Sequence, residues 1–139
     1  MNKHLLAALS MFSLCTFAVA AENTQPVLPN VARQILLDAA VSPEKSIANV
    51  EIQELTFAPK RKGPLHLHPV PVFSVIKEGA IMFQIEGEAP QHLKTGDVFY
   101  EPANVRIAHI DNEGDTPAKL VVFYMLGKDD HEFVRILEK

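Results

Sequence analysis

Two histidines, His66 and His68, stand two positions apart in an apolar stretch that is rich in proline. Alternate side chains of a β-strand point to the same face, so a strand here would hold both imidazoles on one side, about 6–7 Å apart. Two imidazoles at this spacing can bind one metal ion. The pair therefore predicts a site for a divalent transition metal that needs at least one more ligand from elsewhere in the chain. The alternative is a pair of histidines that are only hydrogen-bonded within the fold.

The segments that must position this pair are short and apolar, and turn residues separate them. We expect strands at residues 50–57, 65–67, 72–76, 80–85, 91–93, 98–100, 105–110 and 119–126. A bulge would explain one break in the alternation of the first strand. Residues 31–40 could form a short helix or an edge strand, and residues 129–139 an edge strand or a short helix. Short strands at this spacing predict an all-β fold, either an antiparallel sandwich or a barrel.

The start of the chain predicts a secretory signal peptide. Lys3 supplies a positive charge, an apolar run follows it, and Ala18-Val19-Ala20 is typical of a cleavage site. A membrane anchor is the alternative, which the short apolar run disfavours. We therefore expect a cleaved leader at 1–20, a lead-in and edge element at 21–48 and the folded domain at 49–139. The mature protein would be periplasmic or secreted, without membrane insertion after cleavage.

The composition limits the kinds of partner that we expect this protein to bind. The single cysteine, Cys15, lies in the leader, so the mature chain has no disulfide. Lysine and arginine number 13 against 17 aspartate and glutamate residues, with a formal net charge of −4. A nucleic-acid-binding protein would carry a basic footprint, and this chain has none. The expected partner is a small molecule.

The segment around the histidine pair resembles the first motif of the cupin superfamily, in particular its small single-domain type-2 members. That motif reads His-x-His, three or four residues, Glu, six residues, Gly. His66, His68 and Gly79 fit it. Val72 stands where the family has its glutamate ligand, and Lys60 where it has an opening glycine.

The second cupin motif reads Gly, five residues, Pro-x-Gly, two residues, His, three residues, Asn. Gly96 and Pro102 fit it. Asn104 replaces the second glycine, which a turn tolerates because asparagine accepts a positive φ. Ile107 stands at the histidine position and Asp111 at the asparagine position.

The resemblance covers roughly residues 50–126 and implies an antiparallel jelly-roll barrel. It also implies a possible homodimer, because cupins often pair through exchanged or abutting edge strands. From the residues themselves, the apolar segment 31–37 is the part that could cover such an edge.

With the motif's glutamate missing, four residues near the motifs are candidates for completing the site. His109 lies two residues beyond Ile107 and would face the same side of a regular strand, although a solvent-facing position is an equal alternative. Gln84 could coordinate a metal or orient another ligand, or simply point outward. Glu101 and Tyr100 flank the second motif and could supply an acid–base group at the rim, or Glu101 could simply be a turn residue before Pro102.

Two or three neutral imidazoles suit zinc, copper, nickel or iron. The resemblance favours a dioxygenase-like or isomerase-like enzyme that acts on a small organic molecule, with the metal as Lewis acid or activator of dioxygen. One alternative is a non-catalytic exported barrel that binds a small ligand or a metal. Another is a structural barrel with a degenerate site. The basic run 60–62 is either a solvated loop or attracts an anionic ligand.

Overall fold

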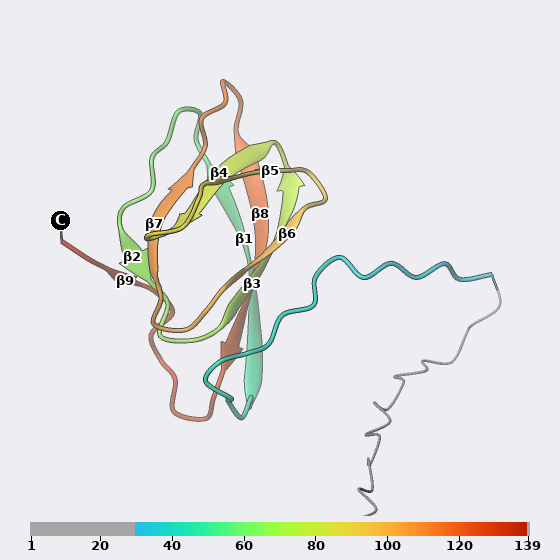
Figure 1. The fold of residues 1–139 in the computed structure, drawn as a ribbon, viewed down its shortest axis with the longest axis vertical. Coiled ribbons are helices and arrows are strands. Elements are labelled where there is room, and N and C mark those ends of the chain that lie inside the picture. Colours follow the sequence, from blue (N-terminus) through green and yellow to red (C-terminus); the bar gives the residue numbers. More distant parts are fainter. Residues whose placement is uncertain (1–29, 139) are drawn as a thin grey trace, which may run out of the picture. The chain divides into compact units, whose positions relative to one another are not determined.

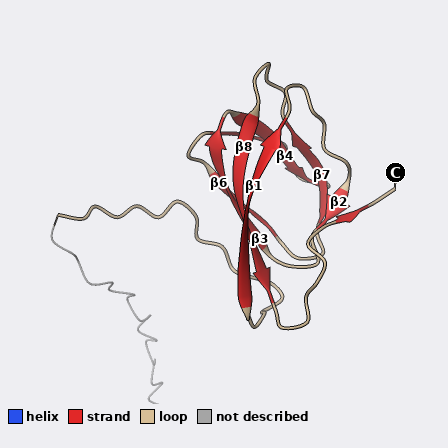
Figure 2. Cartoon of the chain, turned by 180° about the vertical axis from the view of Figure 1, so that it is seen from behind, coloured by secondary structure: helices blue, strands red, loops and turns tan. Residues whose placement is uncertain are grey.

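The computed structural model describes residues 30–138, and all of its strands lie in a unit that begins at Gln34. In chain order the strands are β1 (Asn49–Phe57), β2 (His66–Leu67), β3 (Val72–Glu78), β4 (Ala80–Ile85), β5 (Gln91–Lys94), β6 (Val98–Glu101), β7 (Arg106–Asp111), β8 (Ala118–Leu126) and β9 (Arg135–Ile136). They form two antiparallel sheets, ordered β1-β8-β3-β6 and β5-β4-β7-β2-β9 (Figure 1). The described chain contains strands and loops but no helix (Figure 2).

Apolar side chains of both sheets meet in one hydrophobic core. In β8 every second residue is buried, as the alternation of a strand predicts. The ring of Phe83 in β4 lies 4.8 Å from that of Phe99 in β6, so the two sheets contact each other through aromatic side chains. The largest side chains that are almost fully buried are Phe83, Ile76, Ile81, Ile107 and Leu120. Burying each such side chain stabilises the fold by about 1.5–3 kcal/mol, which keeps the inner faces of the sheets fixed.

The predicted all-β fold is confirmed, and each strand expected between residues 50 and 126 is present with small shifts at its ends. The tail forms the edge strand β9. Residues 31–40, expected as a short helix or an edge strand, form neither. Within the described chain the sheets are not closed into a barrel, because strand pairing stays inside each sheet. The predicted signal peptide, residues 1–20, lies outside the described residues.

The bulge predicted in the first strand is wrong. The register of β1 with β8 is continuous from Asn49 to Phe57. Strict alternation therefore turns Val50 and Ile52 outward, where they are 43% and 59% exposed, while Phe57 is buried. The edge strand β1 thus presents apolar side chains on its outer face.

Two residues take a left-handed backbone conformation where the resemblance expects glycine. The φ angle is 56° at Lys60 and 62° at Asn104. Asparagine enters this region more easily than most residues, so the prediction for Asn104 is confirmed. The backbone N–H of Asn104 donates to the carbonyl of His68 at 2.7 Å. This turn therefore holds the histidine segment in place.

Within residues 30–138, no helix is long and apolar enough to cross a membrane.

A buried asparagine links the loop after β7 to the end of β1 through hydrogen bonds. Asn112 is 2% exposed. Its Nδ2 lies 3.2, 3.0 and 2.8 Å from the carbonyl oxygens of Phe57, Ala58 and Thr116. Its Oδ1 accepts a hydrogen bond from the N–H of Gly114 at 3.0 Å. One side chain thus satisfies backbone groups that would otherwise be buried without partners.

We expect Asn112→Ala to lower the free energy of unfolding by about 2–3 kcal/mol, because buried backbone groups lose their partners. Urea denaturation of the two proteins measures this difference. Glu113→Ala is the matched control at an exposed neighbouring position and should change stability by less than about 0.5 kcal/mol. Equal stability of Asn112→Ala and the wild-type protein would contradict the proposed role of Asn112.

Candidate metal centre

His66 and His68 lie in and just after β2, and both are buried, at 5% and 6% exposure. The strand is short but pairs on both sides, with His66 opposite Ile107 of β7 and Ile136 of β9. The two imidazole rings meet edge to face, with centroids 5.1 Å apart. The structure thus brings together the two rings whose spacing predicted a metal site.

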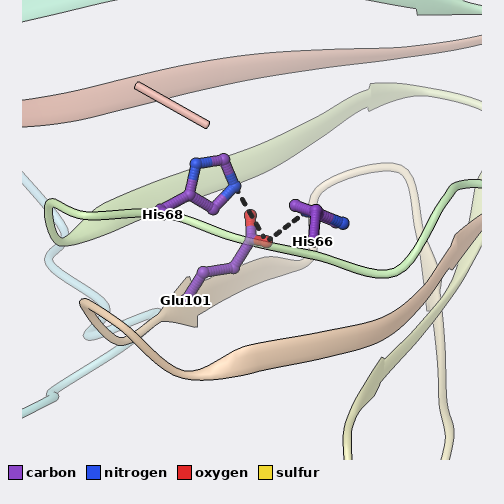
Figure 3. Close-up of side chains that lie close together, drawn as sticks. All are labelled: His66, His68 and Glu101. Carbon is purple, nitrogen blue, oxygen red and sulfur yellow. Dashed lines mark ion pairs between the residues drawn. The ribbon is translucent and has the colours of Figure 1, made fainter. Parts of the chain in front are cut away.

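The third member of the cluster is Glu101, at the end of β6, which is 2% exposed. Its Oε2 atom lies 3.7 Å from Nε2 of His66 and 3.4 Å from Nε2 of His68. Figure 3 shows the carboxylate pointing at both rings. A carboxylate and two imidazoles therefore converge from strands that are distant in the sequence.

The other ring nitrogen of each histidine faces a backbone carbonyl. Nδ1 of His66 lies 2.9 Å from the carbonyl oxygen of Pro64, and Nδ1 of His68 is hydrogen-bonded to the carbonyl oxygen of Phe133. A carbonyl oxygen can only accept, so Nδ1 carries the proton in each neutral ring. The Nε2 lone pairs then face the carboxylate, which is the tautomer and orientation that a metal ligand needs.

The electrostatics of the cluster favour a positive charge between its members. Burial alone would raise the pKa of Glu101, but the polar contacts and charge of His66 and His68 outweigh it and hold that pKa below its usual range. Burial also disfavours the charged form of His68, whereas Glu101 and the carbonyl of Phe133 favour it, so the pKa of His68 lies above its usual range. A cation, whether a proton or a metal ion, is therefore stabilised at this point.

The donor atoms fit a divalent metal ion. One ligand atom from each of His66, His68 and Glu101 lies within 4.8 Å of the other two. Two ligands at about 2.1 Å from a tetrahedral ion are about 3.4 Å apart, close to the carboxylate–imidazole distances here. Oε2 of Glu101 is buried without a hydrogen-bond partner among residues 30–138. A buried, unsatisfied carboxylate oxygen is costly unless a cation binds it.

A cavity of about 200 Å³ adjoins the cluster. Most of its wall is apolar, and its polar side chains come from only a few positions. The lining residues are Leu55, Phe57, Arg61, Pro64, His66, His68, Ser74, Glu101, Ile110, Leu120, Val122, Tyr124, Val134 and Ile136. The strand β9 and the residue before it form part of this wall. The cavity is suited to a small organic molecule with few polar groups.

The carboxylate reaches the cluster from an unexpected strand. Val72 of β3, at the glutamate position of the first motif, lies directly opposite Glu101 of β6. Directly opposite residues of an antiparallel pair point to the same face. Glu101 therefore places its carboxylate on the face that a glutamate at position 72 would occupy. Sequence reasoning gave Glu101 an acid–base role at the rim, because the register between these strands cannot be read from the sequence.

The structure does not bring His109 or Gln84 to the cluster. The register of β4 with β7 shifts between Gln84, opposite His109, and Ile85, opposite Ile107. This bulge leaves Ala108 unpaired and reverses the alternation, so that Ile107 and Ile110 are buried while the His109 side chain is 41% exposed. His109 instead contacts Asp111, Nδ1 to Oδ2 at 3.1 Å.

Gln84 and Tyr100 both lie away from the cluster. Nε2 of Gln84 donates to the carbonyl of Glu88 at 2.7 Å. Tyr100 precedes Glu101 in β6 and so points to the opposite face of the sheet. There it stacks on Phe73, with ring centroids 4.7 Å apart.

Two polar residues of the cavity were missed from the sequence. Ser74 and Tyr124 both line it. Burial, and then the charge of Glu101, raise the pKa of the Tyr124 hydroxyl, so this group is a neutral hydrogen-bond donor near the cluster. The strict alternation of β8, which puts Tyr124 on the face of Leu120 and Val122, was the signal that could have identified it.

Solved structures with a similar fold include enzymes and proteins described only as cupins. A cupin-like protein from Thermotoga maritima has 22% sequence identity and a TM-score of 0.56, covering 70% of this chain and 71% of that one. The DMSP lyase DddQ from Ruegeria pomeroyi DSS-3 has 21% identity and a TM-score of 0.54, over 63% of this chain and 42% of that one. An oxalate oxidase in complex with the substrate analogue glycolate has 21% identity and a TM-score of 0.55, over 63% and 46%.

At these identities the likeness concerns the fold, and this chain spans less than half the length of the lyase and the oxidase. No curated protein matches the chain. Residues 53–124 match the cupin domain family. That match spans more than half of the sequence, and the protein therefore belongs to the cupin family.

Proposed function

We propose that this cupin binds a divalent transition metal ion, namely iron, copper, nickel or zinc, through His66, His68 and Glu101, and that the adjoining cavity holds a small organic substrate. The observation that carries the proposal is the buried Oε2 of Glu101, which has no hydrogen-bond partner in the described chain and faces the Nε2 atoms of both histidines. A purely structural cluster would satisfy that oxygen with a hydrogen-bond donor.

The donor set limits the chemistry. Two imidazoles and one carboxylate are the ligands of non-haem iron oxygenases and of several catalytic zinc sites. Such a metal supplies Lewis-acid chemistry, and iron or copper also supplies reactions with dioxygen. The neutral Tyr124 hydroxyl can donate a hydrogen bond to a bound molecule within the cavity.

Of the possible functions, we favour a dioxygenase-like or isomerase-like enzyme. Structural neighbours that are enzymes, the oxalate oxidase and the DMSP lyase, support it at the level of the fold. The alternative is a non-catalytic protein that stores or delivers a small ligand or the metal itself, and the largely apolar wall of the cavity favours it. Turnover of a substrate by the metal-loaded protein, lost in the metal-free form, would separate the two.

Three wider expectations belong to the same proposal. The two sheets follow the jelly-roll topology of the family, the leader directs the protein to the periplasm or the exterior, and nucleic acid is not a partner. A homodimer is also proposed. Exposed apolar side chains of the lead-in, Ile35 at 80% and Leu36 at 61%, support it together with Ile52 of the edge strand β1 at 59%.

We expect His66→Ala and His68→Ala to lose the bound metal while remaining folded. Each substitution removes one of three ligands, and the core residues are untouched. Elemental analysis of protein purified without chelators or a histidine tag measures the metal content. His92→Ala and His109→Ala, outside the cluster, are the controls and should retain it. Failure of the wild-type protein to bind iron, copper, nickel or zinc would overturn the proposal.

The pairing of Val72 with Glu101 allows the carboxylate to be moved across the sheet. We expect Glu101→Val to weaken metal binding by at least about tenfold, since one ligand is lost. The double variant Val72→Glu/Glu101→Val should recover much of that loss, because the new carboxylate projects from the same face. Metal titration of both variants, with circular dichroism to verify folding, provides the test. A folded double variant that binds no better than Glu101→Val contradicts it.

Metal affinity should rise with pH and then level off. A proton on His68 competes with the metal, and the pKa of this ring lies above its usual 6.5. Below that pKa the apparent affinity should increase about tenfold per pH unit for one competing proton, and above it the affinity should be constant. Calorimetric titrations with zinc in buffers of different ionisation enthalpy would detect the released proton. An affinity that does not change between pH 5 and 8 would argue against His68 as a ligand.

A further inference from the structure

Arg61 is the only lysine or arginine among the residues that line the cavity in the described chain. Its guanidinium carbon lies over the ring of Phe57, 4.8 Å from the centroid. The backbone of Arg61 is also fixed: its N–H donates to the carbonyl of Ala58 at 3.3 Å, and its carbonyl accepts the N–H of Asn112 at 2.9 Å. A positive charge is thus positioned at the cavity wall.

The neighbouring basic residue is engaged elsewhere, whereas Arg61 is not. Nζ of Lys60 lies 2.9 Å from Oδ1 of Asp115 and donates to the carbonyl of Glu113 at 2.7 Å. No ion pair found within residues 30–138 includes Arg61. Arg61 is exposed to solvent, and its five N–H donors remain available to a molecule at the cavity wall.

Ser74 supplies an independent indication of a polar ligand. It is 2% exposed, lines the cavity and has no hydrogen-bond partner for its Oγ among residues 30–138. It projects from β3, two positions after Val72, and so lies on the same inner face as the metal-site carboxylate. A buried hydroxyl in a largely apolar wall is satisfied when a ligand atom meets it.

The charges of the loaded cavity favour an anion. A divalent ion beside one carboxylate, Glu101, leaves a net positive charge, and Arg61 adds another. We propose that the ligand is a small organic carboxylate whose anionic group pairs with Arg61, while a polar atom reaches Ser74 and an apolar body lies along the wall. This inference rests on the proposed function for part of the cavity's positive charge and for the position of the ligand's metal-facing end.

The test compares acetate, butyrate, hexanoate and benzoate with their uncharged amides, by calorimetry on the zinc-loaded protein. At least one carboxylate should bind about tenfold or more tightly than its amide, the range expected for a charged hydrogen-bonded pair. Arg61→Met should abolish that preference while retaining the zinc. Lys62→Met is the matched control, because it removes the same charge from a neighbour that does not line the cavity. Ser74→Ala should weaken the binding of 6-hydroxyhexanoate, which carries a second polar group, by severalfold and leave the binding of hexanoate unchanged.

The outcomes separate this inference from the proposed function. A preference for carboxylates that survives Arg61→Met and disappears in His66→Ala would mean that the anion binds at the metal, and it would overturn the role of Arg61. Equal binding of every acid and its amide would overturn the carboxylate class. A protein that takes up none of iron, copper, nickel and zinc, but whose metal-free form still shows a preference that depends on Arg61, would overturn the metal proposal and leave the inference standing.

Discussion

The constraint on which this site depends is a carboxylate oxygen held away from water. Oε2 of Glu101 is buried between two imidazoles whose remaining nitrogens are committed to backbone carbonyls. Desolvation of such an oxygen costs several kcal/mol unless a positive charge or donors compensate it. The surrounding sheets are stabilised independently by their apolar core. The free energy that this core contributes can offset the desolvation cost of burying the polar cluster.

The sheet geometry explains how the cluster can form without the glutamate of the first motif. Opposite positions on two antiparallel strands share a face, so positions 72 and 101 are equivalent in direction even though they are far apart in the chain. The structure therefore has a carboxylate on the face expected for the motif's glutamate, supplied by a different strand.

Most of the strands and the convergence of His66 with His68 could be predicted from the sequence, because both follow from a local period of two. The orientation of His109 could not. It depends on one bulged residue, Ala108, and a single insertion turns every later side chain of β7 to the other face. The position of the Glu101 carboxylate could not be predicted either, because it depends on the register of β6 with β3. In β1 the expected bulge is absent, so Val50 and Ile52 point outward and not toward the core. Here too, a shift of one residue decides which face of the sheet a side chain occupies.

The hydrogen bond from His68 to the carbonyl of Phe133 has a consequence for the order of assembly. Phe133 lies far beyond the other members of the cluster in the chain, and its ring packs on Tyr124 while β9 pairs with β2. During synthesis His66, His68 and Glu101 all leave the ribosome before this carbonyl does. The ring of His68 acquires its fixed tautomer only when the C-terminal strand has docked. Docking of the segment that holds Phe133, which follows formation of the strands that carry the cluster, is therefore the step that fixes the orientation of the His68 ring.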